Sequence, residues 1–110
     1  MRFTATEAGF KEGLGGASNS KSSGKYHYVL FGIQADLQDS ENSGVYFEWD
    51  DQSNGAMNSV KEVVIGDKSV TIIMKEGESL EIKCNVSTEQ WDELNQGLRT
   101  VFLRKMVTTV

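Results

Sequence analysis

Apolar and polar residues alternate strictly in the stretch that follows Ser79. The apolar members of this alternation are Leu80, Ile82, Cys84 and Val86. Successive side chains of a strand point to opposite faces, so the pattern predicts a strand with one face toward a core. Two further apolar runs precede it, and the segments Gly66-Asp67-Lys68 and Glu76-Gly77-Glu78 separate them as turns. The segment 60–86 therefore predicts a β-meander.

Two aromatic segments upstream also read as strands. Tyr26 to Ile33 is rich in aromatic and β-branched residues, which predicts a strand. Val45 to Trp49 alternates, so that Tyr46 and Glu48 share the face opposite to Val45, Phe47 and Trp49. The following residues, 50–55, end in Asn-Gly and are typical of an acidic turn. Phe3 to Phe10 gives a weaker strand pattern.

The period changes after Val86, where the pattern predicts a helix. Ser87-Thr88-Glu89-Gln90 matches a capping box, which satisfies free amides of the first helical turn. One face of this helix carries its apolar residues, which are Trp91, Leu94, Leu98, Val101 and Phe102. Gly97 interrupts it and would allow a close approach to the sheet. The expected fold is α+β: a largely antiparallel β-sheet of about five or six strands with one C-terminal α-helix packed on it.

Length and composition agree with one globular domain. The 110 residues are 38% hydrophobic and 25% charged, so a single domain over residues 1–110 is expected. Residues 11–25 are rich in Gly and Ser and have little to bury, which predicts a flexible loop. The glycines of this loop do not have the spacing of a phosphate-binding loop.

The acidity of the chain is local. No Lys or Arg occurs from Tyr26 to Val60, and this window carries a formal charge of −6 against −5 for the whole chain. Its acids are Asp36, Asp39, Glu41, Glu48, Asp50 and Asp51. A local excess of one sign indicates a surface directed at a partner, and it disfavours direct binding to nucleic acid.

Candidate catalytic and metal-binding residues are few. His27 has no nucleophile near it in sequence, so a solvent-facing strand residue is expected. Glu48 and Asp50 would share a strand face as paired carboxylates, but acids beside a turn are common. The run 50–55 fails the spacing of a calcium-binding loop. We therefore predict no catalytic residues, no metal site, no cofactor and no enzymatic activity.

The single cysteine, Cys84, lies on the apolar face of its strand and is expected in the core. One cysteine allows neither an internal disulfide nor a cysteine-based zinc site, which favours the cytoplasm. The first residues lack the apolar region of a signal peptide, and no apolar run is long enough to cross a bilayer.

The order of elements from Val45 to Phe102 resembles the Imm10 family, predicted immunity proteins of bacterial polymorphic toxin systems. The residues that carry the resemblance are Tyr46, Glu48, Asp51, Gln52, Gly55, the run Val63 to Ile73, Leu94, Leu98 and Phe102. The resemblance implies a non-catalytic protein that binds and neutralises a cognate toxin, which in many such systems is a nuclease with a basic cleft.

An acidic surface would then contact the toxin. The expected contact residues are Asp36, Asp39, Glu41, Tyr46, Glu48, Asp50, Asp51 and Gln52. Tyr26 and Tyr28 would add anchors if they face outward, and changing Asp50 and Asp51 to Lys would slow association without unfolding the protein.

The alternative is a small-ligand module with an aromatic-lined pocket between sheet and helix, opening near Trp49 or Trp91. An enzyme that uses Glu48 and Asp50 is a third possibility, and a solubilising role of the acids a fourth.

Overall fold

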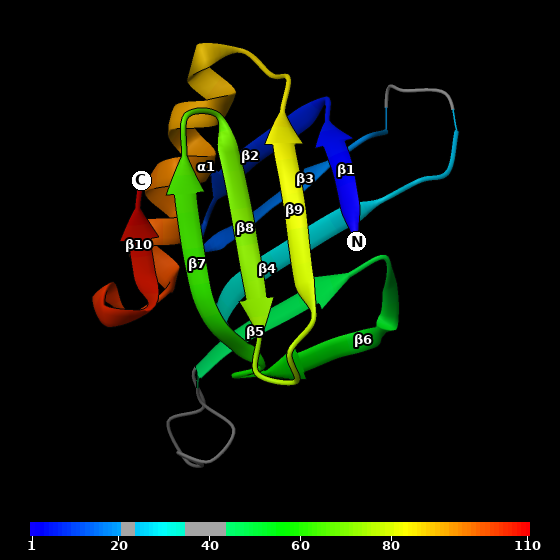
Figure 1. Ribbon diagram of the computed structural model, residues 1–110. Coiled ribbons are helices and arrows are strands. Elements are labelled where there is room, and N and C mark those ends of the chain that lie inside the picture. The colour runs from blue at the N-terminus through cyan, green and yellow to red at the C-terminus, as the bar shows by residue number, and fades with distance from the viewer. Residues whose placement is uncertain (21–23, 35–43) are drawn as a thin grey trace.

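The computed structural model describes residues 1–20, 24–34 and 44–110. Within these residues, ten strands form two five-stranded sheets that face one another, and one α-helix lies along their side (Figure 1). The predicted class is confirmed: the fold is α+β, its strand pairs are mostly antiparallel, and a helix packs on a sheet. The described strands exceed the expected five or six because Leu14–Ser18, Asp51–Met57 and Val107–Thr109 also form strands and the segment Phe3 to Phe10 forms two.

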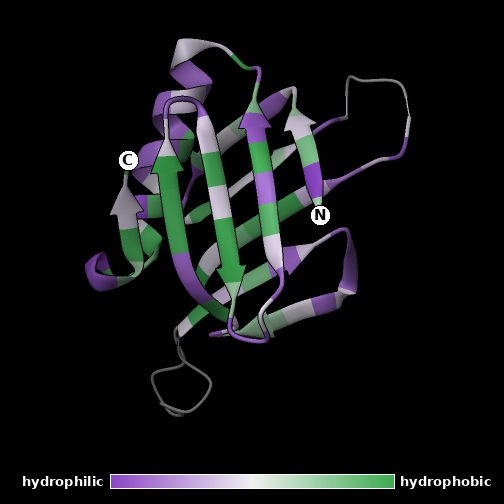
Figure 2. Ribbon diagram, in the orientation of Figure 1, coloured by the Kyte–Doolittle hydropathy of each residue, from purple (hydrophilic) through white to green (hydrophobic). Residues whose placement is uncertain are grey.

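The first sheet, sheet A, holds the predicted meander. Its order is β1 (Arg2–Ala5), β9 (Ser79–Cys84), β8 (Ser69–Met74), β7 (Val60–Gly66) and β10 (Val107–Thr109). The three central strands are antiparallel, whereas β1 runs parallel to β9 and β10 runs parallel to β7. Figure 2 shows the alternation of hydrophobic and hydrophilic residues along β9.

The second sheet, sheet B, is an antiparallel series in chain order. It consists of β2 (Glu7–Lys11), β3 (Leu14–Ser18), β4 (Tyr28–Gln34), β5 (Gly44–Trp49) and β6 (Asp51–Met57). The segment Phe3 to Phe10 is therefore divided at Thr6 between the two sheets, rather than forming one strand.

The prediction of a flexible loop over residues 11–25 is wrong for Leu14–Ser18, which form β3. Small residues are required there because β3 pairs with β4 directly beside a buried aromatic ring. A Cβ atom at Gly15 would collide with the ring of Phe31, which is fully buried. A segment with few apolar side chains is thus a strand because it pairs with β2 and β4.

The prediction of a turn over residues 50–55 is also wrong. The chain reverses at Asp50 alone, and Asn54 and Gly55 lie within β6. The register shifts in this hairpin, since Phe47 pairs with Ala56 but Trp49 pairs with Asp51. The additional residues of β6 form a bulge between these two pairs.

The core lies between the two sheets and is closed at one side by α1 (Thr88–Val101). The Ser87 half of the predicted capping box is present, since the Ser87 hydroxyl accepts a hydrogen bond from the amide of Gln90 at 3.2 Å. The predicted apolar face is buried against the sheets. α1 packs mainly on β2, where a Cβ atom at Gly97 would lie 2.5 Å from the ring of Phe10. After α1, a short 3₁₀ turn, η2 (Arg104–Met106), leads into β10.

Candidate functional site

The outer face of sheet B carries a group of tyrosines around a carboxylate. We name it the tyrosine face; its residues are Leu14, Tyr26, Tyr28, Leu30, Tyr46 and Glu48. Phe31 and Phe47 pair across β4 and β5 and are fully buried, so their neighbours in each strand point to the opposite side of the sheet. The predicted split of Tyr46 and Glu48 from Phe47 is thereby confirmed.

Glu48 is the buried acid of this face, with 7% of its surface exposed. Its carboxylate accepts a hydrogen bond from the hydroxyl of Tyr46 at 2.6 Å and a second one from the hydroxyl of Tyr28. A carboxylate withdrawn from water needs such donors, because an unpaired buried charge is costly. The two phenols therefore hold the charge in place.

The same hydrogen bonds change the ionisation of the phenols. Donation to Glu48, followed by burial and by the nearby negative charge, raises the pKa of Tyr28 well above its ordinary value. The hydrogen bond to Glu48 likewise raises the pKa of Tyr46. Both hydroxyls therefore keep their protons as donors to pH values above those of an ordinary phenol.

Gly55 makes room for this arrangement. A Cβ atom at position 55 would collide with the hydroxyl group of Tyr46, so a side chain there would displace the ring. Tyr46, Glu48 and Gly55 are three of the residues that carry the family resemblance, and they meet at one place on the sheet.

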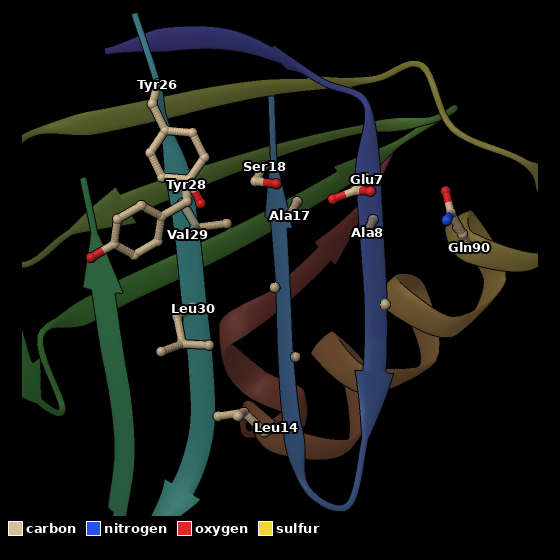
Figure 3. A pocket seen from close by; sticks show the side chains of 13 residues that line it. Glu7, Ala8, Leu14, Ala17, Ser18, Tyr26, Tyr28, Val29, Leu30 and Gln90 are labelled. Atoms are coloured by element: carbon tan, nitrogen blue, oxygen red, sulfur yellow. The ribbon is translucent and has the colours of Figure 1, made fainter. Parts of the chain in front are cut away.

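A hollow of about 520 Å³ lies beside the cluster, over β2, β3 and β4 (Figure 3). Its floor includes Gly9 and Gly16, which pair with one another across β2 and β3. Tyr26 and Tyr28 stand on one side of it, with ring centroids 5.6 Å apart, and Glu7 and Gln90 stand on the other. The hollow combines aromatic walls with a few polar groups, a mixture suited to binding.

Two apolar side chains of the tyrosine face are open to solvent. Tyr26 is 55% exposed and Leu14 is 52% exposed. Exposed apolar groups beside tyrosines, with polar groups at the rim, are typical of protein-binding surfaces.

Asp50 connects two strands, a role that its position in the sequence does not predict. Its Oδ2 atom lies 2.8 Å from Nδ1 of His27, and its Oδ1 atom accepts the amide of Tyr28 at 3.1 Å. The ring of His27 also stacks on Phe3, with centroids 5.7 Å apart. The expectation of a solvent-facing His27 is therefore wrong, and Asp50 joins the start of β4 to the end of β5.

Glu48 and Asp50 consequently have different partners. Glu48 binds the phenols of the tyrosine face, whereas Asp50 binds a histidine that stacks on a core residue. Asp50 adopts φ = 61°, the left-handed region, as the residue at which the hairpin reverses.

The remaining expected contact residues fall into two groups. Asp51 and Gln52 are exposed at the start of β6. The amide of Ser53 donates to Asp51 at 2.8 Å, and this hydrogen bond lowers the pKa of the Asp51 carboxyl. Asp36, Asp39 and Glu41 lie outside the described residues.

Cys84 is buried in the core, as predicted, and burial raises the pKa of its thiol to about 11. In the described parts of the chain, no three metal-binding side chains gather into a group. Within the same residues, α1 and η2 are both too short and too polar to span a bilayer.

Sequence reasoning missed Tyr28 as a partner of Glu48, and it missed the hollow. Both depend on the register of sheet B, in which Leu30 pairs with Glu48 and Ser18 pairs with Tyr28. The alternation in Tyr26-His27-Tyr28 is the available signal, because it places the two tyrosines on one face.

Comparison with known proteins gives no relative: no family model, no curated protein and no solved structure matches this chain.

Proposed function

We propose that this protein is a non-catalytic immunity protein of the cytoplasm, which binds and neutralises a cognate bacterial toxin through the tyrosine face. The observation that supports the proposal most is the buried carboxylate of Glu48, held by two phenols beside exposed Tyr26 and Leu14. Tyrosines fixed by hydrogen bonds lose little freedom when a partner binds, so they make good anchors.

Charge supports a basic partner. Glu48 of β5 and Asp51 of β6 lie in the window 26–60, which contains no Lys or Arg, and Asp51 is exposed. Such charges accelerate association with a basic protein and select it over others. A toxin with a basic nucleic-acid cleft has this chemistry, and the resemblance of residues 45–102 to the Imm10 family names the same class of partner.

The direct test is affinity for the C-terminal domain of a toxin encoded beside this chain. Tyr26→Ala and Leu14→Ser change exposed side chains, so we expect normal folding and at least about tenfold weaker binding for Tyr26→Ala. The matched control is Leu103→Ser, which removes an apolar side chain that is 59% exposed outside the tyrosine face. Calorimetry of each variant with the toxin domain gives the result. Wild-type affinity of Tyr26→Ala, or an equal loss in Leu103→Ser, would overturn the assignment of this face.

The hollow supports a second candidate, a module that binds a small molecule between Tyr28 and Gln90. Its volume of about 520 Å³ falls within the usual range of ligand pockets. Ser18→Phe would fill the hollow. This substitution would abolish binding of a small ligand, whereas a protein partner resting on Tyr26 and Leu14 would lose only part of its affinity.

A further inference from the structure

A second hollow, of about 200 Å³, lies where the bulge of β6 meets the turn between β8 and β9. The residues that line it include Trp49, Asn54, Ser59, Met74, Glu76 and Glu78. Figure 1 shows that turn lying next to β6. It shares no lining residue with the hollow of the tyrosine face, and it is smaller than the usual pocket for a drug-sized molecule. A single small group would fill it.

The chemistry of the lining favours a cation. Trp49 supplies an indole, the aromatic ring that attracts cations most strongly. Glu76 and Glu78 supply two exposed carboxylates at the turn. Lys and Arg are absent from the described lining, and neighbouring Lys75 lines a different hollow. An aromatic ring with two carboxylates and no competing base suits an ammonium or guanidinium group.

An unpaired hydroxyl is a separate indication. Ser59 lines this hollow, and its Oγ atom is buried without a hydrogen-bond partner among the described residues. Buried polar atoms are nearly always paired, so this exception indicates a partner from outside the chain, either water or a ligand. A guanidinium or ammonium group carries several donors and could supply one to this oxygen.

The walls of the hollow are fixed before any ligand arrives. The side-chain amide of Asn54 donates to the carbonyl of Trp49 at 2.8 Å and holds the bulge against β5. On the opposite wall, the amide of Lys75 donates to the carbonyl of Ser59 at 2.9 Å, and the amide of Met74 donates to the carbonyl of Glu78 at 2.8 Å. A site organised in this way loses little entropy on binding.

We propose that the hollow beside Trp49 binds an alkylammonium or alkylguanidinium group, either as a free small cation or as a Lys or Arg side chain of another protein. The indole forms one wall, the carboxylates of Glu76 and Glu78 neutralise the charge, and the hydroxyl of Ser59 accepts one donor. This site is independent of the tyrosine face, so either assignment can fail without the other.

The test uses n-butylguanidinium as the probe and follows the indole N–H resonances of the full chain by NMR. Trp49→Phe identifies the resonance of Trp49, because the chain has two tryptophans. A fragment of this size should bind with Kd of about 1–20 mM. Pentanol and pentanoate, which match its length but are neutral or anionic, should bind at least about tenfold more weakly. Equal binding of pentanol, or no shift at several times that concentration, would overturn the proposal.

Variants separate the site from general attraction to an acidic protein. The double change Glu76→Gln and Glu78→Gln should weaken binding of n-butylguanidinium about tenfold or more, and Ser59→Ala should weaken it several-fold. The control, Glu89→Gln with Asp92→Asn, removes the same charge from exposed positions of α1 and should leave binding within about twofold. An equal loss in this control would show that net charge alone is responsible.

A short blocked peptide with one arginine distinguishes the two sources of the cation. Tighter binding than n-butylguanidinium indicates a protein side chain, since the peptide backbone adds contacts at the rim. Equal or weaker binding indicates a free small cation.

Discussion

At the scale of single residues, Glu48 shows how a charge can stay on the outer side of a sheet and yet be shielded from water. The two phenols that hold it, Tyr28 and Tyr46, come from adjacent strands, so the carboxylate also ties β4 to β5. Hydrogen bonds to a charged group are stronger than neutral ones, and the loss of one partner leaves the others unsatisfied.

Glu48→Gln should lower the pH at which Tyr28 and Tyr46 ionise. The negative charge disappears while the shape of the side chain stays nearly the same, so the main cause of the raised phenol pKa values is weakened. A spectrophotometric titration of phenolate formation measures the effect. An unchanged titration curve would show that Glu48 does not hold these protons.

The raised pKa of Tyr28 also makes the free energy of unfolding depend on pH. The folded chain keeps the Tyr28 proton at pH values where the unfolded chain has lost it, so this contribution to the free energy of unfolding is complete below pH of about 10. It falls as pH rises further, toward the raised pKa of the folded state. Denaturant unfolding at several alkaline pH values should show a gentler fall for Glu48→Gln than for the wild type.

The sequence predicts the faces of these residues but not their partners. Alternation alone places Tyr46 and Glu48 on the side opposite to Phe47. The contact between Glu48 and Tyr28 depends on pairing between strands far apart in sequence, because only the register of β4 with β5 sets it. Asp50 was misjudged for a similar reason, since its partner His27 lies 23 positions away.

At the scale of elements, α1 follows its sequence pattern closely, because cap, apolar face and spacing all indicate the same helix. Strand β3 does not, because glycine and alanine carry no strand signal of their own. Strand β3 forms because it pairs with β2 and β4, and the ring of Phe31 beside Gly15 excludes a larger side chain; local pattern reveals neither of these tertiary features.

Gly97→Ala should destabilise the protein by about 1–3 kcal/mol, although alanine is the better helix former. The new methyl group would lie 2.5 Å from ring atoms of Phe10 and 2.7 Å from its Cβ atom, so the helix would have to move away from β2. Chemical denaturation measures the change. The control is Gln96→Ala, an exposed position of the same helix, which should be neutral or slightly stabilising. A gain in stability for Gly97→Ala would contradict the close approach of α1 to β2.

At the scale of the whole molecule, the acidic charge does not form the simple exposed tip expected from the sequence. Glu48 is buried, Asp50 is bound to His27, and Asp51 is exposed. The expectation that Asp50 and Asp51 can both be reversed in charge without structural cost is therefore corrected for Asp50, which would lose His27 and the amide of Tyr28.

Asp51→Lys is the clean test of electrostatic steering toward the proposed toxin. We expect the association rate to fall about three- to tenfold at low salt and to change little at high salt. Stopped-flow mixing with the toxin domain measures it. Asp67→Lys, the same charge change at the exposed turn between β7 and β8, serves as the control. Equal slowing by both variants would show that net charge matters and that the position of Asp51 does not.

The parallel pairing of β1 with β9 determines how early in synthesis sheet A can be completed. Arg2 lies opposite Glu81, so the first strand has no partner until the chain has been synthesised almost to α1. At the usual pace of translation, that wait is roughly 4–16 s. Contacts so distant in sequence also slow folding itself. If the protein neutralises a toxin, as proposed, a newly synthesised chain gives no protection until sheet A is complete. Cells would therefore need a supply of already folded molecules when the toxin arrives.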